Sequence, residues 1–213
     1  SCSLVGSEMC KETDLYFILK LRTLYLKKVR FINLIVIHCS ATRCDRSYTE
    51  HELTTDHLRR GFSGAGYHYY IRRNGDIKTL RPLERSGAHA KGQRYSVGIC
   101  YEGGLDERGH PADTRTDFQK HSLRVLVMLL LRDYPDSRLC GHRDLSPDLN
   151  RNSEIEPEEW IKACPCFDAA SILQEPPPQS GLIVMQLVYA KGYVMLFLLN
   201  NVIGINNIHV FLL

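Results

Sequence analysis

Two histidines and a cysteine have the residue types of a metal site. His38 ends a β-branched apolar run, His142 follows a short apolar stretch in Cys-Gly-His-Arg-Asp, and Cys164 lies in Lys-Ala-Cys-Pro-Cys. Imidazole nitrogen and thiolate sulfur suit Zn²⁺, and three protein ligands leave the fourth tetrahedral position open, as in catalytic rather than structural sites. Because the three residues are far apart in sequence, a structural role for His38 stays an alternative.

Several strands are expected to position these residues. The run 31–37 is short, apolar and β-branched, which is typical of a strand buried on both faces. Asn74-Gly75 separates two strand-like runs and predicts a hairpin with a type I′ turn. Residues 97–101 and 139–140 read as further strands.

Helices are expected between the strands. One covers 49–60, a second follows the cap residue Thr116 and ends near Tyr134, and a third, short helix covers 157–161. Interleaved strands and helices predict an α/β fold. We therefore expect a single domain with a central mixed β-sheet flanked by helices, and a zinc site in a cleft at the sheet edge.

Composition divides the 213 residues into three segments. Residues 1–30 form an N-terminal extension without a secretory signal pattern, 31–175 form the expected domain, and 176–213 hold a Pro-rich linker and a hydrophobic tail. The tail contains no clean stretch of about 20 apolar residues, so a β-hairpin or a non-native extension is favoured over membrane association. A formal net charge of only +3 argues against a nucleic-acid partner.

Six ordered segments of the middle part resemble one family. They are Ile-Val-Ile-His-Cys-Ser-Ala-Thr (35–42), Gly-Tyr-His-Tyr-Tyr-Ile-Arg-Arg-Asn-Gly (66–75), Gly-Ala-His-Ala-Lys-Gly (87–92), Ser-Val-Gly-Ile-Cys-Tyr-Glu-Gly-Gly (96–104), Gly-His-Arg-Asp (141–144) and Lys-Ala-Cys-Pro-Cys-Phe-Asp (162–168). Together they resemble the zinc-dependent N-acetylmuramoyl-L-alanine amidases of the type 2 family, which includes amidase-type phage lysozymes and peptidoglycan recognition proteins. The resemblance covers about residues 31–170.

This resemblance implies an activity and a set of site residues. It implies hydrolysis of the amide bond between N-acetylmuramic acid and L-alanine in peptidoglycan, by a bacterial or phage-encoded protein that acts on the cell wall. The implied residues are the zinc ligands His38, His142 and Cys164, the catalytic Tyr67 and Lys162, and His89 as a substrate-binding residue. A tyrosine hydroxyl or a lysine ammonium can stabilise a developing oxyanion and relay protons. For His89, a structural role is the alternative.

Two other functions stay open at this point. One is a non-catalytic peptidoglycan-binding recognition module, and the other is an amidase that acts on soluble muropeptides in cell-wall recycling. Non-catalytic relatives typically lack the cysteine ligand, so the presence of Cys164 favours an enzyme. The compartment is left open.

The stretch between His142 and Cys164 is longer than in compact phage members. Read as a calcium loop, it places Asp148, Asn150 and Asn152 at positions one, three and five and Glu159 at position twelve. Ser153 replaces the usual glycine, so a polar insertion near the cleft is the alternative.

A few further residues have open roles. Cys166 is either a substitute ligand or a disulfide partner, and the pairs Cys39–Cys44 and Cys2–Cys10 are close enough in sequence to bond. His68 is expected to pack inside the domain. The pairs Arg59-Arg60 and Arg72-Arg73 are expected to be solvated charges, with a contact to a peptide-stem carboxylate as the alternative for either pair.

Overall fold

The computed structural model describes residues 30–174 and three later strands. The N-terminal extension and the Pro-rich linker expected from the sequence lie outside the described residues, so the proposed domain boundaries stay a prediction. The strands are β1 (Leu34–Cys39), β2 (Thr42–Arg43), β3 (Tyr69–Ile71), β4 (Ile77–Thr79), β5 (Ser96–Tyr101), β6 (Gly104–Leu105) and β7 (Arg138–Gly141). The helices are α2 (Glu50–Arg59) and α3 (Asp117–Asp133), with 3₁₀ turns η2 (Arg143–Leu145), η3 (Pro157–Glu159) and η4 (Ala169–Leu173).

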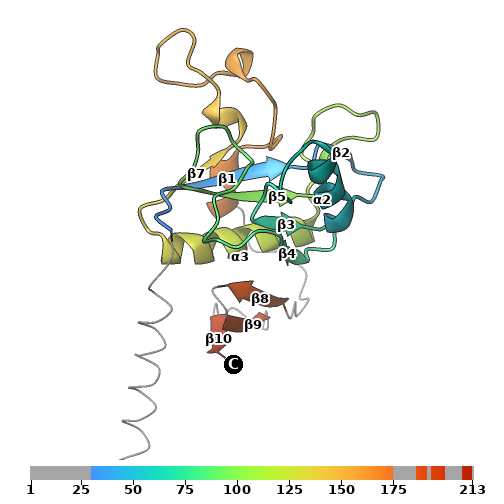
Figure 1. The fold of residues 1–213 in the computed structure, drawn as a ribbon, viewed down its shortest axis with the longest axis vertical. Helices are drawn as coiled ribbons and strands as arrows, with labels where there is room; N and C mark the ends of the chain where they lie inside the picture. Colours follow the sequence, from blue (N-terminus) through green and yellow to red (C-terminus); the bar gives the residue numbers. More distant parts are fainter. Residues whose placement is uncertain (1–29, 175–185, 191–192, 200–207, 213) are drawn as a thin grey trace, which may run out of the picture. The chain divides into compact units, whose positions relative to one another are not determined.

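Five of these strands form one mixed sheet in the order β4-β3-β5-β1-β7 (Figure 1). β1 pairs in parallel with β5 on one side and β7 on the other, and β3 is parallel to β5. β4 runs antiparallel to β3. The expected α/β fold with a central mixed sheet is confirmed, and its parallel strands end together at one edge. β2 and β6, a short parallel pair beside that sheet, had no clear sequence signal.

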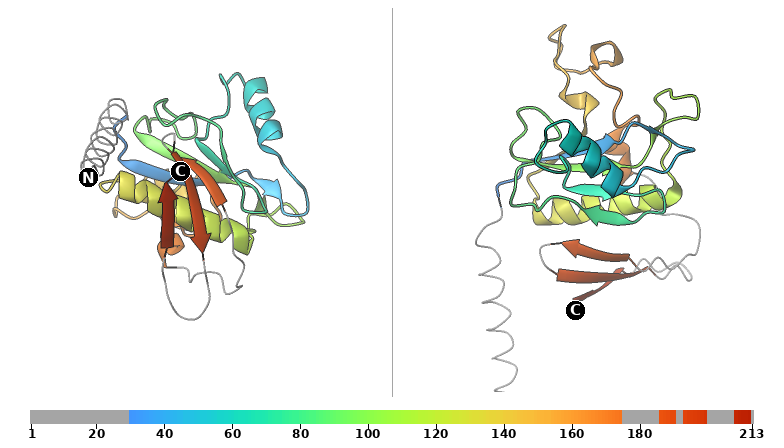
Figure 2. Two further views of the ribbon diagram at one scale, coloured as in Figure 1. Left: turned by 90° about the horizontal axis from the view of Figure 1, so that it is seen from below. Right: turned by 45° about the vertical axis from the view of Figure 1, so that its right-hand side comes forward.

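Helices cover the sheet on both faces. The main core on one face draws on the strands, α3 and η4: Ile35, Ile37, Ile71, Ile99, Leu123, Leu126 and Ile172. A smaller cluster on the other face joins Leu53 of α2 to Tyr70 and Cys100. Figures 1 and 2 show α3 running along one face while α2 lies toward the opposite one. His38 pairs with Cys100, so the alternation along β1 directs it to the α2 face.

Both long helices begin where the sequence predicts. The side-chain oxygens of Thr49 and Thr116 each accept a hydrogen bond from the backbone N–H three residues later. In turn, the side chains of Glu52 and Gln119 accept a hydrogen bond from the backbone N–H of the threonine. These reciprocal capping boxes satisfy donors that have no partner within the helix. The prediction of a third helix over 157–161 is wrong in type and length, because only the single 3₁₀ turn η3 forms there. The chain turns to extended geometry at Trp160, directly after that turn.

The expected hairpin is confirmed between β3 and β4. The expected type I′ turn at Asn74-Gly75 is wrong, because Gly75 has a positive φ and Asn74 does not; the backbone N–H of Gly75 donates to Arg72 O, so the turn is centred one residue earlier. Gly75 has φ +88°, a left-handed conformation that costs glycine little, and Asn74 Oδ1 accepts the backbone N–H of Asp76. The expected strand 31–37 is shifted, since β1 extends to Cys39 and is buried along its whole length. His38 therefore lies inside β1 rather than after it, and it is paired with Cys100 of β5.

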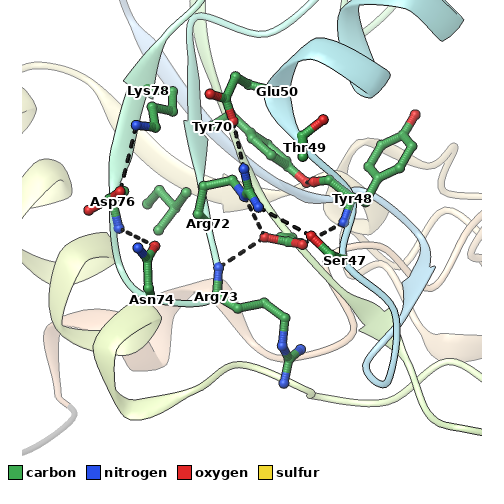
Figure 3. Close-up of polar contacts among 12 residues, drawn as sticks. Ser47, Tyr48, Thr49, Glu50, Tyr70, Arg72, Arg73, Asn74, Asp76 and Lys78 are labelled. Atoms are coloured by element: carbon green, nitrogen blue, oxygen red, sulfur yellow. Dashed lines mark hydrogen bonds and ion pairs between the residues drawn. The ribbon is translucent and has the colours of Figure 1, made fainter.

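A buried carboxylate ties the segment before α2 to the hairpin. Glu102 accepts hydrogen bonds from the backbone N–H groups of Tyr48 and Arg73 at 2.6 and 3.0 Å, and from Arg72 Nε at 2.8 Å. Arg72 also donates to Glu50 and Ser47 (Figure 3). The expectation that Arg72 is a solvated charge is wrong, because its side chain is 23% exposed and held by two carboxylates.

Replacing Glu102 with alanine should destabilise the fold strongly. It removes the acceptor of Arg72 Nε–H and of two backbone N–H groups, and leaves Arg72 only the more exposed carboxylate of Glu50. Removing one partner of a buried ion pair costs about 3–5 kcal/mol. For a chain of this size that corresponds to a fall in Tm of roughly 10 °C in a thermal melt followed by circular dichroism. The control is Asp45→Ala, because the exposed pair of Asp45 with Arg43 contributes little to stability. Equal melting temperatures for the two variants would contradict this role for Glu102.

The tail contains β8 (Gln186–Ala190), β9 (Tyr193–Leu199) and β10 (Ile208–Leu212). They form a three-stranded antiparallel sheet in the order β10-β9-β8. The β-hairpin expected in this segment is present as β8 and β9. Within the described part of the chain, no helix has both the length and the apolar character needed to cross a membrane.

Candidate metal centre

The structure brings His38, His142 and Cys164 together. One potential ligand atom from each lies within 4.8 Å of the others, and no other such group occurs among the described His, Cys, Asp and Glu residues. Cys164 Sγ is 3.9 Å from His38 Nδ1. In a tetrahedral zinc site a nitrogen and a sulfur ligand lie roughly 3.6 Å apart, so this N, N, S set can hold a metal ion with little movement.

Three separate parts of the sheet edge deliver these residues. His38 comes from β1, and His142 follows β7, with its backbone N–H donating to Ile37 O at 3.1 Å. Cys164 comes from the segment after η3, which is joined to this edge where Arg143 N–H donates to Cys164 O at 2.7 Å. The backbone N–H of Cys39 also points at Cys164 Sγ, at 3.3 Å. A thiolate there accepts a hydrogen bond as well as facing the two imidazoles.

Both histidines are held in the form that binds metals. Burial is the largest cause that lowers the pKa of His38 well below its ordinary value, and the neighbouring His89, His142 and Lys162 lower it further. Burial and then Lys162 lower the pKa of His142. A low pKa keeps an imidazole neutral at neutral pH, and the neutral ring has the lone pair that a metal needs.

A cleft of about 630 Å³ opens beside this cluster. His142, Cys164, Lys162, Tyr67 and His89 all line it, so the residues expected in catalysis and substrate binding share one cavity. Its other wall comes from α2 and the segment after it: His57, Arg59, Arg60 and Phe62. Lys162 and Cys164 alternate along their segment, which explains how both reach the same cavity.

Tyr67 lines this cleft between two histidine rings. Its ring centroid is 5.1 Å from that of His38 and 5.4 Å from that of His57. Burial raises the pKa of Tyr67 well above its ordinary value, so the hydroxyl keeps its proton and can donate a hydrogen bond. His57 accepts the backbone N–H of Gly66 at Nδ1, at 2.9 Å, and so fixes the chain next to Tyr67. Sequence reasoning missed His57 because one histidine in an amphipathic helix has no distinctive pattern.

His68 and the remaining cysteines have structural surroundings. His68 is fully buried, accepts the backbone N–H of Gly98 at 3.0 Å and lies 3.1 Å from Arg85 O, as expected for a packing role. Cys39 and Cys44 are free thiols, so they are not joined to each other. Cys166 lies outside the three-residue cluster, with Sγ 3.9 Å from Cys39 Sγ. A hydrogen bond with Cys164 is the main cause that raises the pKa of Cys39 to about 12.

The loop read as a calcium site is closed by its own hydrogen bonds. Asp148 accepts the backbone N–H groups of Arg151 and Ser153 at 2.6 and 2.8 Å. The side-chain oxygens of Asn150 and Asn152 each accept the backbone N–H two residues on. Glu159 accepts three backbone N–H groups, from Leu149, Asn150 and Glu156. The polar oxygens thus stabilise the loop, and calcium binding stays a prediction.

Comparisons with known proteins agree on one family. The family model described as N-acetylmuramoyl-L-alanine amidase matches residues 28–159. An uncharacterized protein of Haemophilus influenzae is 46% identical over 101 residues, which cover 47% of this chain and 87% of that protein. The endolysin of Enterobacteria phage T3 is 36% identical over 135 residues, covering 63% of this chain and 80% of the endolysin.

A solved structure supports the same conclusion. The endolysin N-acetylmuramoyl-L-alanine amidase LysCS from Clostridium intestinale is similar with a TM-score of 0.50 and 29% sequence identity, covering 65% of this chain and 77% of that one. The family match ends before Lys162 and Cys164. The position of these two residues in the site therefore depends on the geometry described above.

Proposed function

The chain belongs to the N-acetylmuramoyl-L-alanine amidase family, and from this premise we propose how its cleft works. The enzyme hydrolyses the amide bond between N-acetylmuramic acid and L-alanine in peptidoglycan. The observation that carries the proposal is the convergence of His38, His142 and Cys164 on one point beside the cleft. This donor set is retained in full, which favours an enzyme over a recognition module without catalysis.

Zinc is the ion that this donor set suits best. Two neutral imidazoles and one thiolate are borderline-soft ligands, which Zn²⁺ prefers over the oxygen ligands that calcium or magnesium select. When bound, zinc lowers the pKa of water toward about 7 and polarises the scissile carbonyl. His38, His142 and Cys164 would hold the ion and leave the cleft side open to substrate.

Tyr67 and Lys162 supply the remaining chemistry in this proposal. The protonated Tyr67 hydroxyl and the Lys162 ammonium donate hydrogen bonds to the oxyanion that forms when the lactyl amide carbonyl is attacked. Either group can then pass a proton to the departing amine of L-alanine, which must leave protonated. Arg59 and Arg60 line the cleft wall, where their positive charge would suit a carboxylate of the peptide stem.

The relatives support a place of action on the cell wall. The phage T3 relative is an endolysin, and the present chain matches 80% of its length. We infer that the substrate is cell-wall peptidoglycan, with soluble muropeptides from recycling as the alternative. The His89 ring lines the same cleft, which supports a contact with substrate.

Product analysis tests this function directly. The protein is incubated in parallel with intact sacculi and with soluble anhydro-muropeptides, and the products are identified by mass spectrometry. We expect free stem peptides with a new L-alanine amino terminus and lactyl carboxylates on the glycan, formed faster from sacculi. A chelator should stop the reaction and Zn²⁺ should restore it. Cleavage between sugars or inside the stem would overturn the assignment, and faster turnover of muropeptides would select the recycling alternative.

The calcium loop has its own test. Calorimetric titration of metal-stripped protein with Ca²⁺ is expected to show binding if Asp148, Asn150, Asn152 and Glu159 act as ligands. The matched control is Asp148→Asn, which removes one charge from the first loop position. An absence of heat at millimolar Ca²⁺ in the unmodified protein would exclude the site.

A further inference from the structure

His89 contacts the metal centre through one of its ring nitrogens. His89 Nδ1 lies 3.0 Å from His38 Nε2, and it is the other nitrogen of His38, Nδ1, that faces Cys164. The second nitrogen of His89, Nε2, lies 3.2 Å from Ser96 Oγ. Both nitrogens of the His89 ring are thus engaged inside the protein, one of them by a candidate zinc ligand.

The hydrogen bonds of Ser96 determine where the protons lie. The Ser96 hydroxyl donates its single proton to Gln93 O at 2.6 Å, so Ser96 Oγ can only accept from His89 Nε2–H. With His89 neutral, its imidazole has a single N–H group, which Ser96 places at Nε2, and His89 Nδ1 is then an acceptor. Its donor is His38 Nε2–H. His38 Nδ1 is left with a free lone pair on the side of Cys164.

Two glycines leave room for the His89 ring against the sheet. An added Cβ at Gly98 would lie 2.4 Å from the ring atoms Cγ and Cδ2, and one at Gly87 would lie 2.4 Å from Cδ2. Gly98 and Ser96 are two apart on β5, and the register pairs Gly98 with Val36 and Cys100 with His38. Ser96, Gly98 and His38 therefore lie on the same face of the sheet: Ser96 bonds the His89 ring, Gly98 leaves room for it, and His38 is the candidate zinc ligand.

We infer that His89 is a positioning residue that holds His38 in the Nε2–H tautomer and so presents Nδ1 to zinc. This inference rests on the proposed zinc function and assigns His89 a role beyond substrate contact. Hydrogen-bond partners of metal-bound histidines set the tautomer and ring orientation and typically contribute 10- to 100-fold in metal affinity. Since both His89 nitrogens are engaged, substrate can meet only the face and carbon edge of the ring.

Two substitutions at His89 separate the possibilities. His89→Leu keeps much of the volume but removes the acceptor, whereas His89→Asn keeps an oxygen close to the position of Nδ1. Zinc affinity is measured on the full chain by competition with a chelating dye, independently of amidase activity. We expect about 10- to 100-fold weaker binding for His89→Leu and near-normal binding for His89→Asn. Ring ¹⁵N shifts of metal-free protein should show His38 as the Nε2–H tautomer, and as a mixture in His89→Leu.

Normal zinc binding by His89→Leu would contradict the positioning role of His89. If His89→Leu binds zinc normally and only the KM for muropeptide rises, His89 is a substrate contact and the inference is overturned. Should His89→Leu fail to fold, Gly98→Ala provides the same test, because its Cβ displaces the ring without removing any nitrogen. The proposed amidase function fails separately, if the unmodified protein with one bound zinc cleaves neither sacculi nor muropeptides.

Discussion

Replacing Cys164 with serine is expected to remove both the zinc and the activity. A serine hydroxyl is protonated at neutral pH and cannot replace the charge or the softness of a thiolate. His38 and His142 would remain as two neutral ligands, too few for a stable site. Hydrolysis of sacculi should fall by at least about a hundredfold, beyond the usual effect of losing an outer partner of a ligand.

Cys166 provides the matched control for this experiment. It lies two residues further along the same segment, is also a free thiol and stands outside the three-residue cluster. Cys166→Ser should keep one zinc per chain by elemental analysis and keep its hydrolysis rate. If Cys166→Ser loses the metal while Cys164→Ser retains it, the ligand is Cys166, the alternative that sequence reasoning left open. Normal cell-wall clearing by Cys164→Ser would refute the proposed mechanism.

Replacing Tyr67 with phenylalanine is expected to slow catalysis without affecting zinc. The change removes one hydroxyl from the lining of the cleft and leaves the ring packed beside His38 and His57. Loss of one donor to an oxyanion costs about 10²–10³ in kcat, while substrate affinity changes little. The measurements are kcat and KM on a soluble muropeptide, together with zinc content.

Tyr95 gives a surface control for the tyrosine experiment. Its side chain is 55% exposed and does not line the cleft, so Tyr95→Phe should retain wild-type kcat. An unchanged kcat in Tyr67→Phe would move the oxyanion role to Lys162 alone. A loss of zinc in Tyr67→Phe would show that the tyrosine supports the metal site rather than the reaction.

The sequence was most informative where local chemistry determines structure. Thr49 and Thr116 mark the helix starts because each begins a capping box. Gly75 marks the hairpin because it takes a positive φ, although the turn type differs from the one expected. Residues 157–161 have the composition of a helix start but form only one 3₁₀ turn. With so few residues before the extended segment at Trp160, the chain cannot complete the bonds of an α-helix.

The candidate site was predictable only in part. The residue types of His38, His142 and Cys164 suggested a metal site, but the set could be assigned only through the resemblance to a family whose zinc ligands fall on these three positions. The contact between His89 and His38 could not be predicted, because the loop that carries His89 has no hydrophobic periodicity that would indicate where its side chains lie. The same holds for Glu102 and Arg72, which are joined across 30 residues by folding alone. Long-range pairs between polar side chains leave no local signal in the sequence.

The parallel pairing of β1 with β7 has a consequence for how this protein acquires its metal. His38 and His142 are over a hundred residues apart and meet only after a crossover that includes α3 has closed. Closing so long a loop is entropically slow, and contacts of this separation form late in folding. Partly folded chains therefore present scattered single ligands with little affinity for zinc. Under the zinc proposal, metal uptake would mark the completion of folding, and a bound zinc ion would oppose the separation of the central strands by mass action.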